Sequence, residues 1–297
     1  MLTPQYLLLK LLWGGLLARP IFSLFMPFYL TAPRLLKFPQ FLVLLYGEST
    51  QVGATQKLSE RENLCINIPR LSIIIPTLNE AENIKAALAS TQPSTNVEVI
   101  VVDGGSKDKT VEIAKSVGVT VISSIAGRAN QMNVGAVAAS GDILLFLHAD
   151  TRLPIGFDVM VRAALVQPGI VAGAFALRID AEMGSLRLVE WGVNVRSRFL
   201  QMPYGDQAIF LTRQIFNEIG GFPELPIMED FELMQRLKRL GKIAFISVPV
   251  ITSARRWLQK GIWQTTLLNQ IIIIAYYLGV SPMRIWSWYR REKLRRL

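Results

Sequence analysis

The chain has 297 residues, 51% of them hydrophobic, and its 32 Lys and Arg against 22 Asp and Glu give a net charge of +10. This length allows one large α/β domain with appendages. The single cysteine, Cys65, excludes an internal disulfide and a cysteine-based metal site and fits a reducing, cytosolic compartment. With His148 as the single histidine, neither a His-based zinc site nor a Ser–His–Asp triad is expected. Charge combined with hydrophobicity indicates an anionic membrane surface as a partner and argues against a nucleic acid.

The first 46 residues are mostly apolar but are interrupted by charged residues such as Lys10, Arg19 and Arg34. Neither of their long uninterrupted stretches, 11–18 and 20–33, reaches the roughly 18–20 apolar residues that span a bilayer. A signal peptide is not expected, because no basic segment precedes the apolar stretch and the cleavage pattern is missing. The sequence predicts an interfacial or hairpin-like membrane anchor over 1–46, with a spanning helix or a structural cap as alternatives. A polar linker follows over 47–68.

From Leu71 to about Val250, apolar runs alternate with helical patterns. Strands are predicted at 71–75, 97–102, 119–123, 143–148, 171–179, 207–211 and 243–248. Helices are predicted at 80–90, 107–117, 128–139, 155–166, 184–199, 213–219 and 229–240, with Asn79 as a candidate cap of the first. Such alternation is typical of a doubly wound, mostly parallel sheet. We expect one α/β domain over 69–252, with a Rossmann-like nucleotide-binding half and then an acceptor-binding half.

The last segment, 253–297, combines an apolar stretch with a basic, aromatic tail. Polar amides within 262–280, among them Gln264 and Asn269, favour an interfacial helix. Arginines beside Trp286 and Trp288 suit the headgroup region of a bilayer. A spanning helix and a helix that packs on the domain remain alternatives. We therefore expect the protein at the cytoplasmic face of a membrane, monotopic rather than spanning.

Three acidic motifs accompany this domain. Asp103 and Asp150 each follow an apolar strand, and Glu229-Asp230 begins a predicted helix. Because ligands bind beyond the carboxyl ends of parallel strands, Asp103 and Asp150 should lie on the ligand-binding edge. An acid there can bind a ribose hydroxyl, hold a metal on a phosphate or accept a proton.

The candidate nucleotide-binding residues come from the segments that follow four of the predicted strands. Asp103 can accept hydrogen bonds from a base or ribose, Gly104 lets a ligand approach the backbone, and Arg128 can neutralise phosphate or contact the base. The alternative interpretations are turn formation for the turn residues, helix capping for the residues around Asp103, and an ordinary surface arginine for Arg128. The full set of candidates is Pro76, Thr77, Asn79, Glu80, Asp103, Gly104, Ser106, Arg128, Asn133 and Asp150.

A metal site and an acceptor pocket complete the candidates. Mg²⁺ or Mn²⁺ on a nucleoside diphosphate needs one or two carboxylates besides the phosphates, so Asp150 is the expected ligand, with His148 as a second ligand or a donor behind it. Glu229 and Asp230 can instead complement a helix dipole. Polar groups just upstream, Asp206 and Gln207, would join Glu229 around an acceptor.

Together the ordered motifs Pro76-Thr-Leu-Asn-Glu80, Val102-Asp-Gly-Gly-Ser106, the Arg128–Ala136 segment, His148-Ala-Asp150 and Glu229-Asp230 resemble the inverting family 2 glycosyltransferases of the GT-A fold. Leu-His-Ala-Asp-Thr and Gly-Gly-Phe-Pro before Met-Glu-Asp look like the radical-SAM/selenodomain-associated or arsenosugar-type subgroup, which is similar to diaponeurosporenoate glucosyltransferases.

The resemblance implies that Thr77, Glu80, Asp103 and Arg128 bind the nucleoside. Asp150 matches the last acid of the Asp-x-Asp metal motif, and Asp230 matches the catalytic base. His148 stands where that motif has its first acid, and imidazole favours Mn²⁺ over Mg²⁺.

The expected function is transfer of a sugar, with inversion, from a nucleoside-diphosphate sugar to a hydroxyl or carboxylate of a lipid-like acceptor such as a carotenoid or polyprenyl chain. Uridine diphosphate is the expected nucleotide. The alternatives are a nucleotidyltransferase, for which Pro76–Glu80 lacks a Gly-rich basic loop, and a non-catalytic membrane-bound relative. The sequence makes no prediction of oligomeric state.

Overall fold

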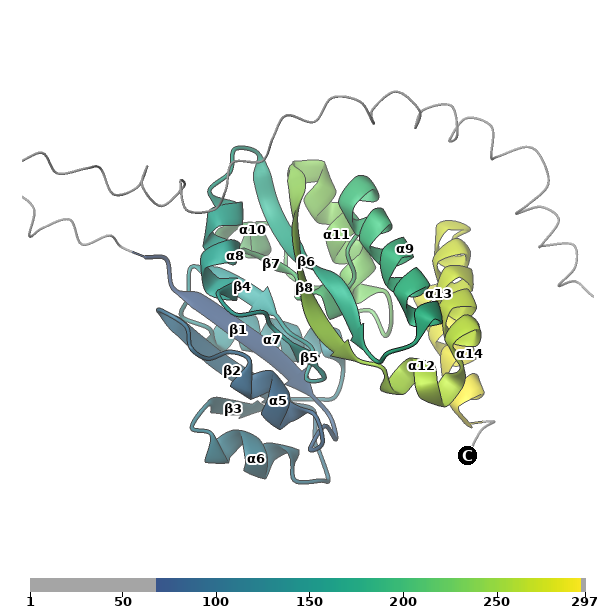
Figure 1. Ribbon diagram of the computed structural model, residues 1–297, viewed down its shortest axis with the longest axis horizontal. Coiled ribbons are helices and arrows are strands. Elements are labelled where there is room, and N and C mark those ends of the chain that lie inside the picture. Colours follow the sequence, from purple (N-terminus) through teal and green to yellow (C-terminus); the bar gives the residue numbers. More distant parts are fainter. Residues whose placement is uncertain (1–67, 295–297) are drawn as a thin grey trace, which may run out of the picture. The chain divides into compact units, whose positions relative to one another are not determined.

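The computed structural model describes residues 68–294, with side chains through Tyr289 (Figure 1). The predicted anchor over 1–46 and, except for Ile68, the predicted linker over 47–68 lie outside these residues. The strands are β1 (Leu71–Thr77), β2 (Val97–Asp103), β3 (Thr120–Ser123), β4 (Ile143–Phe146), β5 (Thr151–Arg152), β6 (Ile170–Asp180), β7 (Phe210–Thr212) and β8 (Lys242–Ser253).

The helices lie between these strands and after the last of them. They are α5 (Ile84–Ala89), α6 (Thr110–Ser116), α7 (Arg128–Ala138), α8 (Phe157–Leu165), α9 (Gly184–Leu200), the 3₁₀ turn η1 (Gly205–Gln207), α10 (Arg213–Glu218), α11 (Glu229–Leu240), α12 (Arg255–Lys260), α13 (Ile262–Tyr277) and α14 (Pro282–Leu294).

The strands form one mixed sheet in the order β3-β2-β1-β4-β7-β6-β8-β5. Strand β7 is antiparallel to both of its neighbours, β4 and β6, and β8 is parallel to β6. The strand direction reverses from β4 to β7 and reverses again from β7 to β6. The carboxyl ends of β1–β4, β6 and β8 therefore all lie at one edge of the sheet. The α/β fold class is confirmed, and the sheet is mixed. Apolar periodicity identifies a short strand such as β7 without giving its direction.

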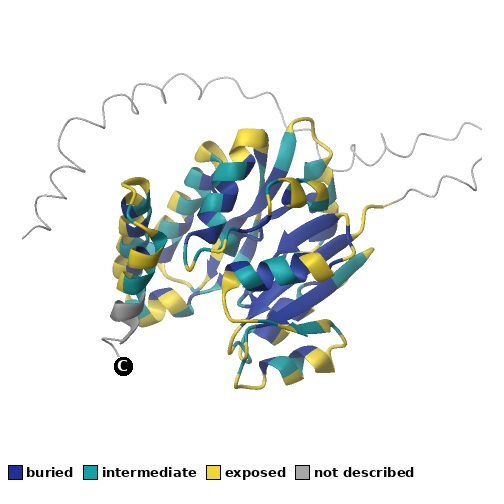
Figure 2. Ribbon diagram, turned by 180° about the vertical axis from the view of Figure 1, so that it is seen from behind, coloured by how far each residue is buried: buried dark blue, intermediate teal, exposed yellow. Residues whose placement is uncertain are grey.

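The central strands are buried (Figure 2), and their alternating side chains build a core on each face of the sheet. Ile74, Val102 and Phe146 pack toward α7, α10 and α11. Ile73, Ile75 and Leu145 pack toward α5, α8 and α9 on the other face. Both faces of the sheet are covered, which explains why its strands read as continuous apolar runs.

The predicted Asn79 cap is wrong. Helix α5 begins at Ile84, after a turn, and its N-cap residue is Asn83. The Asn79 side chain instead accepts a hydrogen bond from the Lys107 backbone N–H at 2.8 Å. The Asn79 side chain therefore bonds to a residue distant in the sequence and does not cap the helix that follows it.

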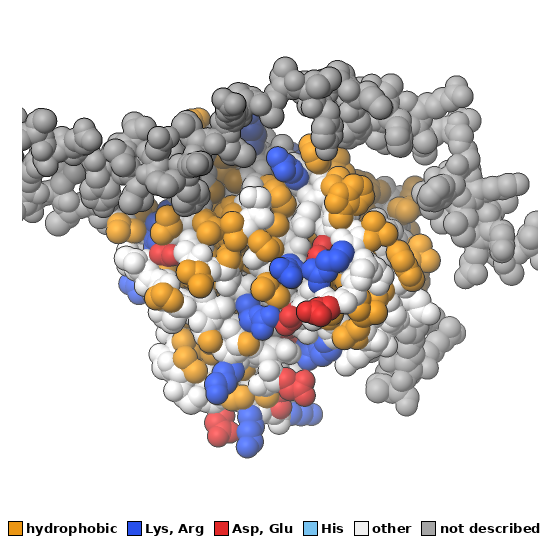
Figure 3. Space-filling model, in the orientation of Figure 1, with side chains coloured by type: hydrophobic (Ala, Val, Ile, Leu, Met, Phe, Trp, Pro, Cys, Tyr) orange, Lys and Arg blue, Asp and Glu red, His pale blue; other side chains and the backbone are white. Residues whose placement is uncertain are grey.

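The C-terminal helices pack on the same compact unit as the sheet. Ile272 and Ala275 of α13 and Ile285 of α14 are buried in the core beside α11. No helix within 68–294 combines the length and the apolar character needed to cross a bilayer. Hydrophobic side chains nevertheless remain at the surface (Figure 3), and those of α9 and its neighbour α13 include the exposed Trp191 and Trp263.

Candidate active site

The loop after β2 is built around the Asp103 carboxylate. This group accepts hydrogen bonds from the hydroxyls of Thr77 (3.3 Å) and Ser106 (2.5 Å) and from the backbone N–H groups of Gly105 and Ser106 (2.9 Å each). Gly105 has a φ of +92°, which favours glycine. Since Asp103 is only 4% exposed, it fixes the shape of the loop that would face a nucleoside.

The loop after β1 is linked to the same network. Pro76 and Thr77 are buried at the end of β1, in register with Val102 and Asp103. The Gly104 N–H donates to the Thr77 carbonyl at 2.9 Å, and the Ser106 hydroxyl accepts from the Asn79 N–H at 2.8 Å. These candidates lie together at the carboxyl edge of the sheet.

Gln131, which was not among the candidates, holds the ends of β1 and β2 together. Its side-chain amide donates to the carbonyls of Thr77 and Val102, each at 2.8 Å, and the residue is buried. An isolated glutamine on a predicted helix gives no sequence signal for such a role.

Glu80 and Asp150 both lie close to Arg255. One guanidinium nitrogen of Arg255 donates to both Glu80 oxygens, at 2.8 and 3.0 Å, and lies 4.0 Å from a carboxylate oxygen of Asp150. Burial, with the negative charge of Glu80, raises the pKa of Asp150, and Arg255 opposes this. Strand β8 delivers Arg255 here, because the Ser253 N–H donates to the Asp150 carbonyl at 3.0 Å.

Helix α7 contributes Arg128 and Asn133. The Arg128 guanidinium forms an ion pair with Glu229 at 2.9 Å, and Glu229 is 2% exposed. The pKa of Glu229 is raised by its burial, which Arg128 counteracts. Asn133 both donates to and accepts from the Phe222 backbone at 2.9 Å. Its amide therefore holds the Gly221-Phe222 turn in place.

His148 and Asp230 share a small space beside Gly205. A Cβ atom built on Gly205 would lie 2.9 Å from His148 Nε2 and 3.3 Å from Asp230 Oδ2. The Gly205 N–H donates to Asp230 Oδ2 at 2.8 Å, and the Phe231 N–H donates to Oδ1 at 2.7 Å. Burial and the charge of Arg128 lower the pKa of His148 to about 3, and the charge of Asp230 opposes this shift. The imidazole is therefore neutral at physiological pH.

Asp206 and Gln207 follow directly. Burial raises the pKa of Asp206 to about 6, with Asp230 adding to the effect and Arg196 opposing it. Asp206 Oδ1 is buried and accepts no hydrogen bond from the described residues. Gln207 is fully buried, donates to the Phe175 carbonyl at 2.9 Å and accepts from the Ser197 hydroxyl at 2.7 Å. Of the two, Asp206 retains an unused acceptor.

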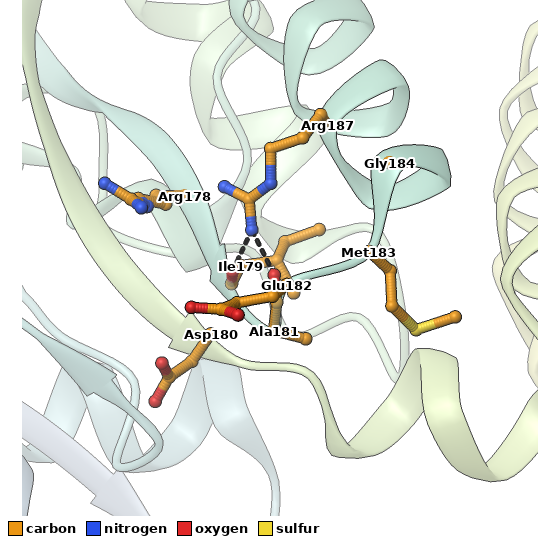
Figure 4. Close-up of a pocket in the computed structure, with 8 residues that line it drawn as sticks. All are labelled: Arg178, Ile179, Asp180, Ala181, Glu182, Met183, Gly184 and Arg187. Carbon is orange, nitrogen blue, oxygen red and sulfur yellow. Dashed lines mark hydrogen bonds between the residues drawn. The ribbon is translucent and has the colours of Figure 1, made fainter.

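A hollow of about 390 Å³ lies between the end of β6 and the start of α9 (Figure 4). The Arg187 guanidinium above it donates to the Ile179 carbonyl at 2.9 Å and to that of Ala181. A smaller hollow of about 80 Å³ is lined by Asp150 and shares Asp180 with the first. Asp180 is therefore common to both hollows, and Asp150 lines only the smaller one.

The donor set for a divalent cation centres on Asp150. Besides phosphate oxygens, such a cation needs one or two carboxylates. Asp150 supplies one, whereas His148 lies beside Asp230 and Gly205. Within the described residues, no cluster of three or more His, Cys, Asp or Glu side chains is arranged for a metal. A cation shared with phosphates would take Asp150 as its protein ligand.

The mixed α/β sheet, with acids beyond β2 and β4 and at the start of α11, matches the fold of GT-A glycosyltransferases. The fold is shared with a mannosyltransferase from Pyrobaculum calidifontis, solved in complex with GDP-Man and Mn²⁺. Its TM-score is 0.52 at 21% identity, over 62% of this chain and 56% of that one.

Residues 72–222, about half of the chain, match the model of Glycosyl transferase family 2, and the chain belongs to that family. An uncharacterised glycosyltransferase from Haemophilus influenzae is 34% identical over 170 residues, 55% of this chain and 54% of that protein. A 4,4'-diaponeurosporenoate glycosyltransferase from Staphylococcus haemolyticus is 36% identical over 92 residues, 28% and 24% of the two chains. The chain thus spans less than two thirds of the length of these relatives. The predicted family is confirmed.

Proposed function

We propose that this protein transfers a sugar from a nucleoside-diphosphate sugar to a lipid-like acceptor, with inversion at the anomeric carbon. The observation that carries the proposal is the joint placement of Asp230 and His148 at Gly205, on the edge that also carries Asp150. Family membership supports the reaction class.

In this proposal Asp230 is the general base. Its two oxygens are oriented by the N–H groups of Gly205 and Phe231 and keep lone pairs for an acceptor proton. The acceptor oxygen bonds to the anomeric carbon as the bond to the diphosphate breaks, and the electron pair of that bond leaves with the phosphate. Attack opposite the leaving group inverts the centre, as in single-displacement glycoside hydrolysis.

Asp150 would hold a divalent cation, Mn²⁺ or Mg²⁺, which when bound would offset the charge of the departing diphosphate. The mannosyltransferase solved with GDP-Man and Mn²⁺ supports a divalent cation in the reaction. Thr77, Glu80, Asp103 and Arg128 are the proposed nucleoside contacts, and uridine diphosphate is the proposed nucleotide. Asp206 would face the acceptor.

The acceptor is proposed to be lipid-like, such as a carotenoid or polyprenyl chain. The similarity to a 4,4'-diaponeurosporenoate glycosyltransferase supports an apolar acceptor. Exposed aromatic and aliphatic side chains on α9 and α13, such as Trp191, Phe199 and Trp263, support contact with a membrane surface.

The test is to incubate the full chain with a panel of nucleotide sugars, Mn²⁺ or Mg²⁺ and a membrane lipid extract. Mass spectrometry should find a glycosylated lipid and an equal amount of released nucleoside diphosphate, and chelation of the metal should stop both. Asp150→Ala should weaken donor binding in the presence of Mn²⁺, as measured by calorimetry.

Two other results would overturn the proposal. Release of inorganic pyrophosphate from a nucleoside triphosphate and a sugar phosphate would indicate a nucleotidyltransferase. Absence of both product and donor-induced thermal stabilisation would indicate a non-catalytic protein.

A further inference from the structure

His148 stands where the metal motif of the family has its first acid, but its surroundings differ from those of Asp150. Asp150 lies 4.0 Å from the Arg255 guanidinium and lines the smaller hollow. His148 does not line that hollow and lies instead beside Gly205 and Asp230. In the part of the chain that the structure describes, no metal cluster of three or more such side chains includes His148. The two ends of the His148-Ala-Asp150 motif therefore have different neighbours.

Gly205 allows His148 and Asp230 to approach one point of the backbone. A Cβ atom on Gly205 would lie 2.9 Å from His148 Nε2 and 3.3 Å from Asp230 Oδ2. Since Gly205 has no positive φ, its missing side chain serves space and not backbone conformation. Both distances start from one point, so Nε2 and Oδ2 are no more than about 6 Å apart, a separation that one oxygen atom can bridge with two hydrogen bonds of about 3 Å.

The His148 ring has unused hydrogen-bonding capacity. Neither of its nitrogens has a hydrogen-bond partner among the described residues, and a neutral imidazole has one N–H donor and one acceptor. A histidine on a metal usually donates its other N–H to a carboxylate or a carbonyl, and His148 has no such partner. Asp230 Oδ2 accepts one hydrogen bond, from the Gly205 N–H at 2.8 Å, and keeps a lone pair.

The carboxyl groups at this turn favour a ligand that donates hydrogen bonds. Asp206 follows Gly205, and its buried Oδ1 accepts no hydrogen bond from the described residues. The Arg128 guanidinium, which could neutralise an anionic ligand, is paired with the buried Glu229 at 2.9 Å. A carboxylate ligand has no proton to donate and would be repelled by Asp206 and Asp230. A hydroxyl group can donate to Asp230 and accept from the imidazole.

We propose that His148 binds the attacking hydroxyl of the acceptor, opposite Asp230, and is not a ligand of the metal. This role rests on the proposed function. The His148 N–H donates to the hydroxyl oxygen, and the hydroxyl proton passes to Asp230 as that oxygen bonds to the anomeric carbon. The bond from this carbon to the phosphate oxygen breaks, and its electron pair leaves with the diphosphate. The reacting group of the acceptor is thus a hydroxyl and not a carboxylate.

The first measurement separates the two roles of His148. Titration calorimetry gives the dissociation constant of uridine diphosphate for the full chain in the presence of Mn²⁺. His148→Leu, which keeps the bulk but makes no hydrogen bond, should leave this constant unchanged, whereas Asp150→Ala should raise it. Even a residue that supports a metal ligand typically contributes about 10–100-fold to metal affinity. A loss of that size in His148→Leu would place the imidazole at the metal and overturn the proposal.

The second measurement follows sugar transfer to the lipid extract. His148→Leu should lower turnover about tenfold, the scale of one lost hydrogen bond. The amount of extract that gives half the maximal rate should rise, and the corresponding donor concentration should not change, because His148 contacts only the acceptor. His148→Gln, whose amide can still donate a hydrogen bond, should recover part of the turnover. The product should resist mild alkali, which cleaves glycosyl esters and leaves glycosides intact.

Gly205→Ala is a second variant at the same point. Its Cβ atom should obstruct an acceptor between His148 and Asp230, which lowers turnover and leaves the affinity for uridine diphosphate with Mn²⁺ unchanged. Gly192→Ala in α9, where a Cβ atom meets nothing within 4 Å, is the matched control and should equal wild type in both measurements. Thermal melting of each variant checks that it folds.

Three results separate this role from the proposed function. Lowered turnover of His148→Leu with unchanged affinity for uridine diphosphate would support the role. Turnover equal to wild type, or a product that mild alkali cleaves, would overturn the role while the proposed transfer stands. A wild type that forms no glycosylated product would overturn both.

Discussion

Asp230 offers the most direct test at the level of single residues, because backbone N–H groups orient both of its oxygens. Asp230→Asn keeps the shape of the side chain and removes the base. We expect turnover to fall by about 10²-fold or more, the usual scale for loss of a general base. The dissociation constant of the nucleoside diphosphate should change little, as measured by calorimetry.

A control for this variant is Asp142→Asn, which lies at the opposite edge of the sheet, where its carboxylate accepts from the Arg70 N–H at 3.0 Å. Its turnover should match wild type. If Asp230→Asn kept turnover within a few-fold of that control, Asp230 could not be the base.

Asp206 predicts a pH dependence of stability. Burial raises its pKa from 3.8 to about 6, so between these values the native state holds a proton that the unfolded state has lost. The free energy of unfolding should therefore fall as pH rises from 4 to 6, by roughly 3 kcal/mol in total from this group. Asp206→Asn should lose that contribution, measured by denaturant unfolding at several pH values.

His148 contributes in the opposite sense. Its pKa is lowered to about 3, so between pH 3 and 6.5 the unfolded state takes up a proton that the native state excludes, and stability rises with pH. Since His148 is present in both proteins, the difference between wild type and Asp206→Asn reports on Asp206. Equal pH slopes for the two proteins would rule out the raised pKa.

The acids beyond strands were predictable because one rule, that ligands bind at carboxyl ends of parallel strands, selects Asp103 and Asp150. The same rule applied to the last strand would have selected Arg255 and Arg256, which follow β8. The partners of Asn133 and Gln207 were not predictable. Those amides bond to backbone groups such as Phe222 and Phe175, whose proximity depends on the tertiary fold.

At the scale of elements, the packing of α7 on the sheet depends on Gly135. A Cβ atom there would lie 2.4 Å from Ile74 Cγ2 and 2.9 Å from Val102 Cγ2. Gly135→Ala should lower the free energy of unfolding by about 1–3 kcal/mol, as overpacking does, despite the better helix propensity of alanine. Denaturant unfolding measures the effect.

Gly192→Ala in α9 is the matched control, because a Cβ atom there meets nothing within 4 Å. In that open position the propensity gain of about 0.5–1 kcal/mol should appear alone and stabilise the protein. Stabilisation by both substitutions would show that α7 does not pack as closely on β1 and β2 as these distances require.

Elements with long apolar runs or strong helical periodicity were predicted well. Strands β1 and β2 and helix α11 begin where the sequence indicates. The direction of β7 and the delayed start of α5 were not predictable. Both depend on partners distant in the chain, β4 and β6 in one case and the Asn79–Lys107 contact in the other.

At the scale of the whole molecule, the C-terminal helices have two sides with different roles. Buried residues such as Ile272 and Ile285 join the core, and Tyr289 contacts Arg256. The opposite side of α13 exposes Trp263, which is 62% accessible. Composition predicted an apolar segment with an aromatic tail, but only the fold separates the residues that pack inward from those that remain exposed.

The exposed apolar face of α9 and α13 predicts binding to a membrane surface. Trp191 and Trp263 are 65% and 62% exposed, and the net charge of +10 favours anionic lipid. Replacing both with Gln in the full chain should weaken binding to phosphatidylglycerol-containing vesicles roughly tenfold, since each buries apolar area in the interface. Flotation of wild type and variant with the vesicles measures this.

The control is Ile155→Gln, at a site that is 87% exposed in the loop before α8. This variant should float as wild type does. Equal flotation of the double variant and wild type would show that this face does not contact lipid.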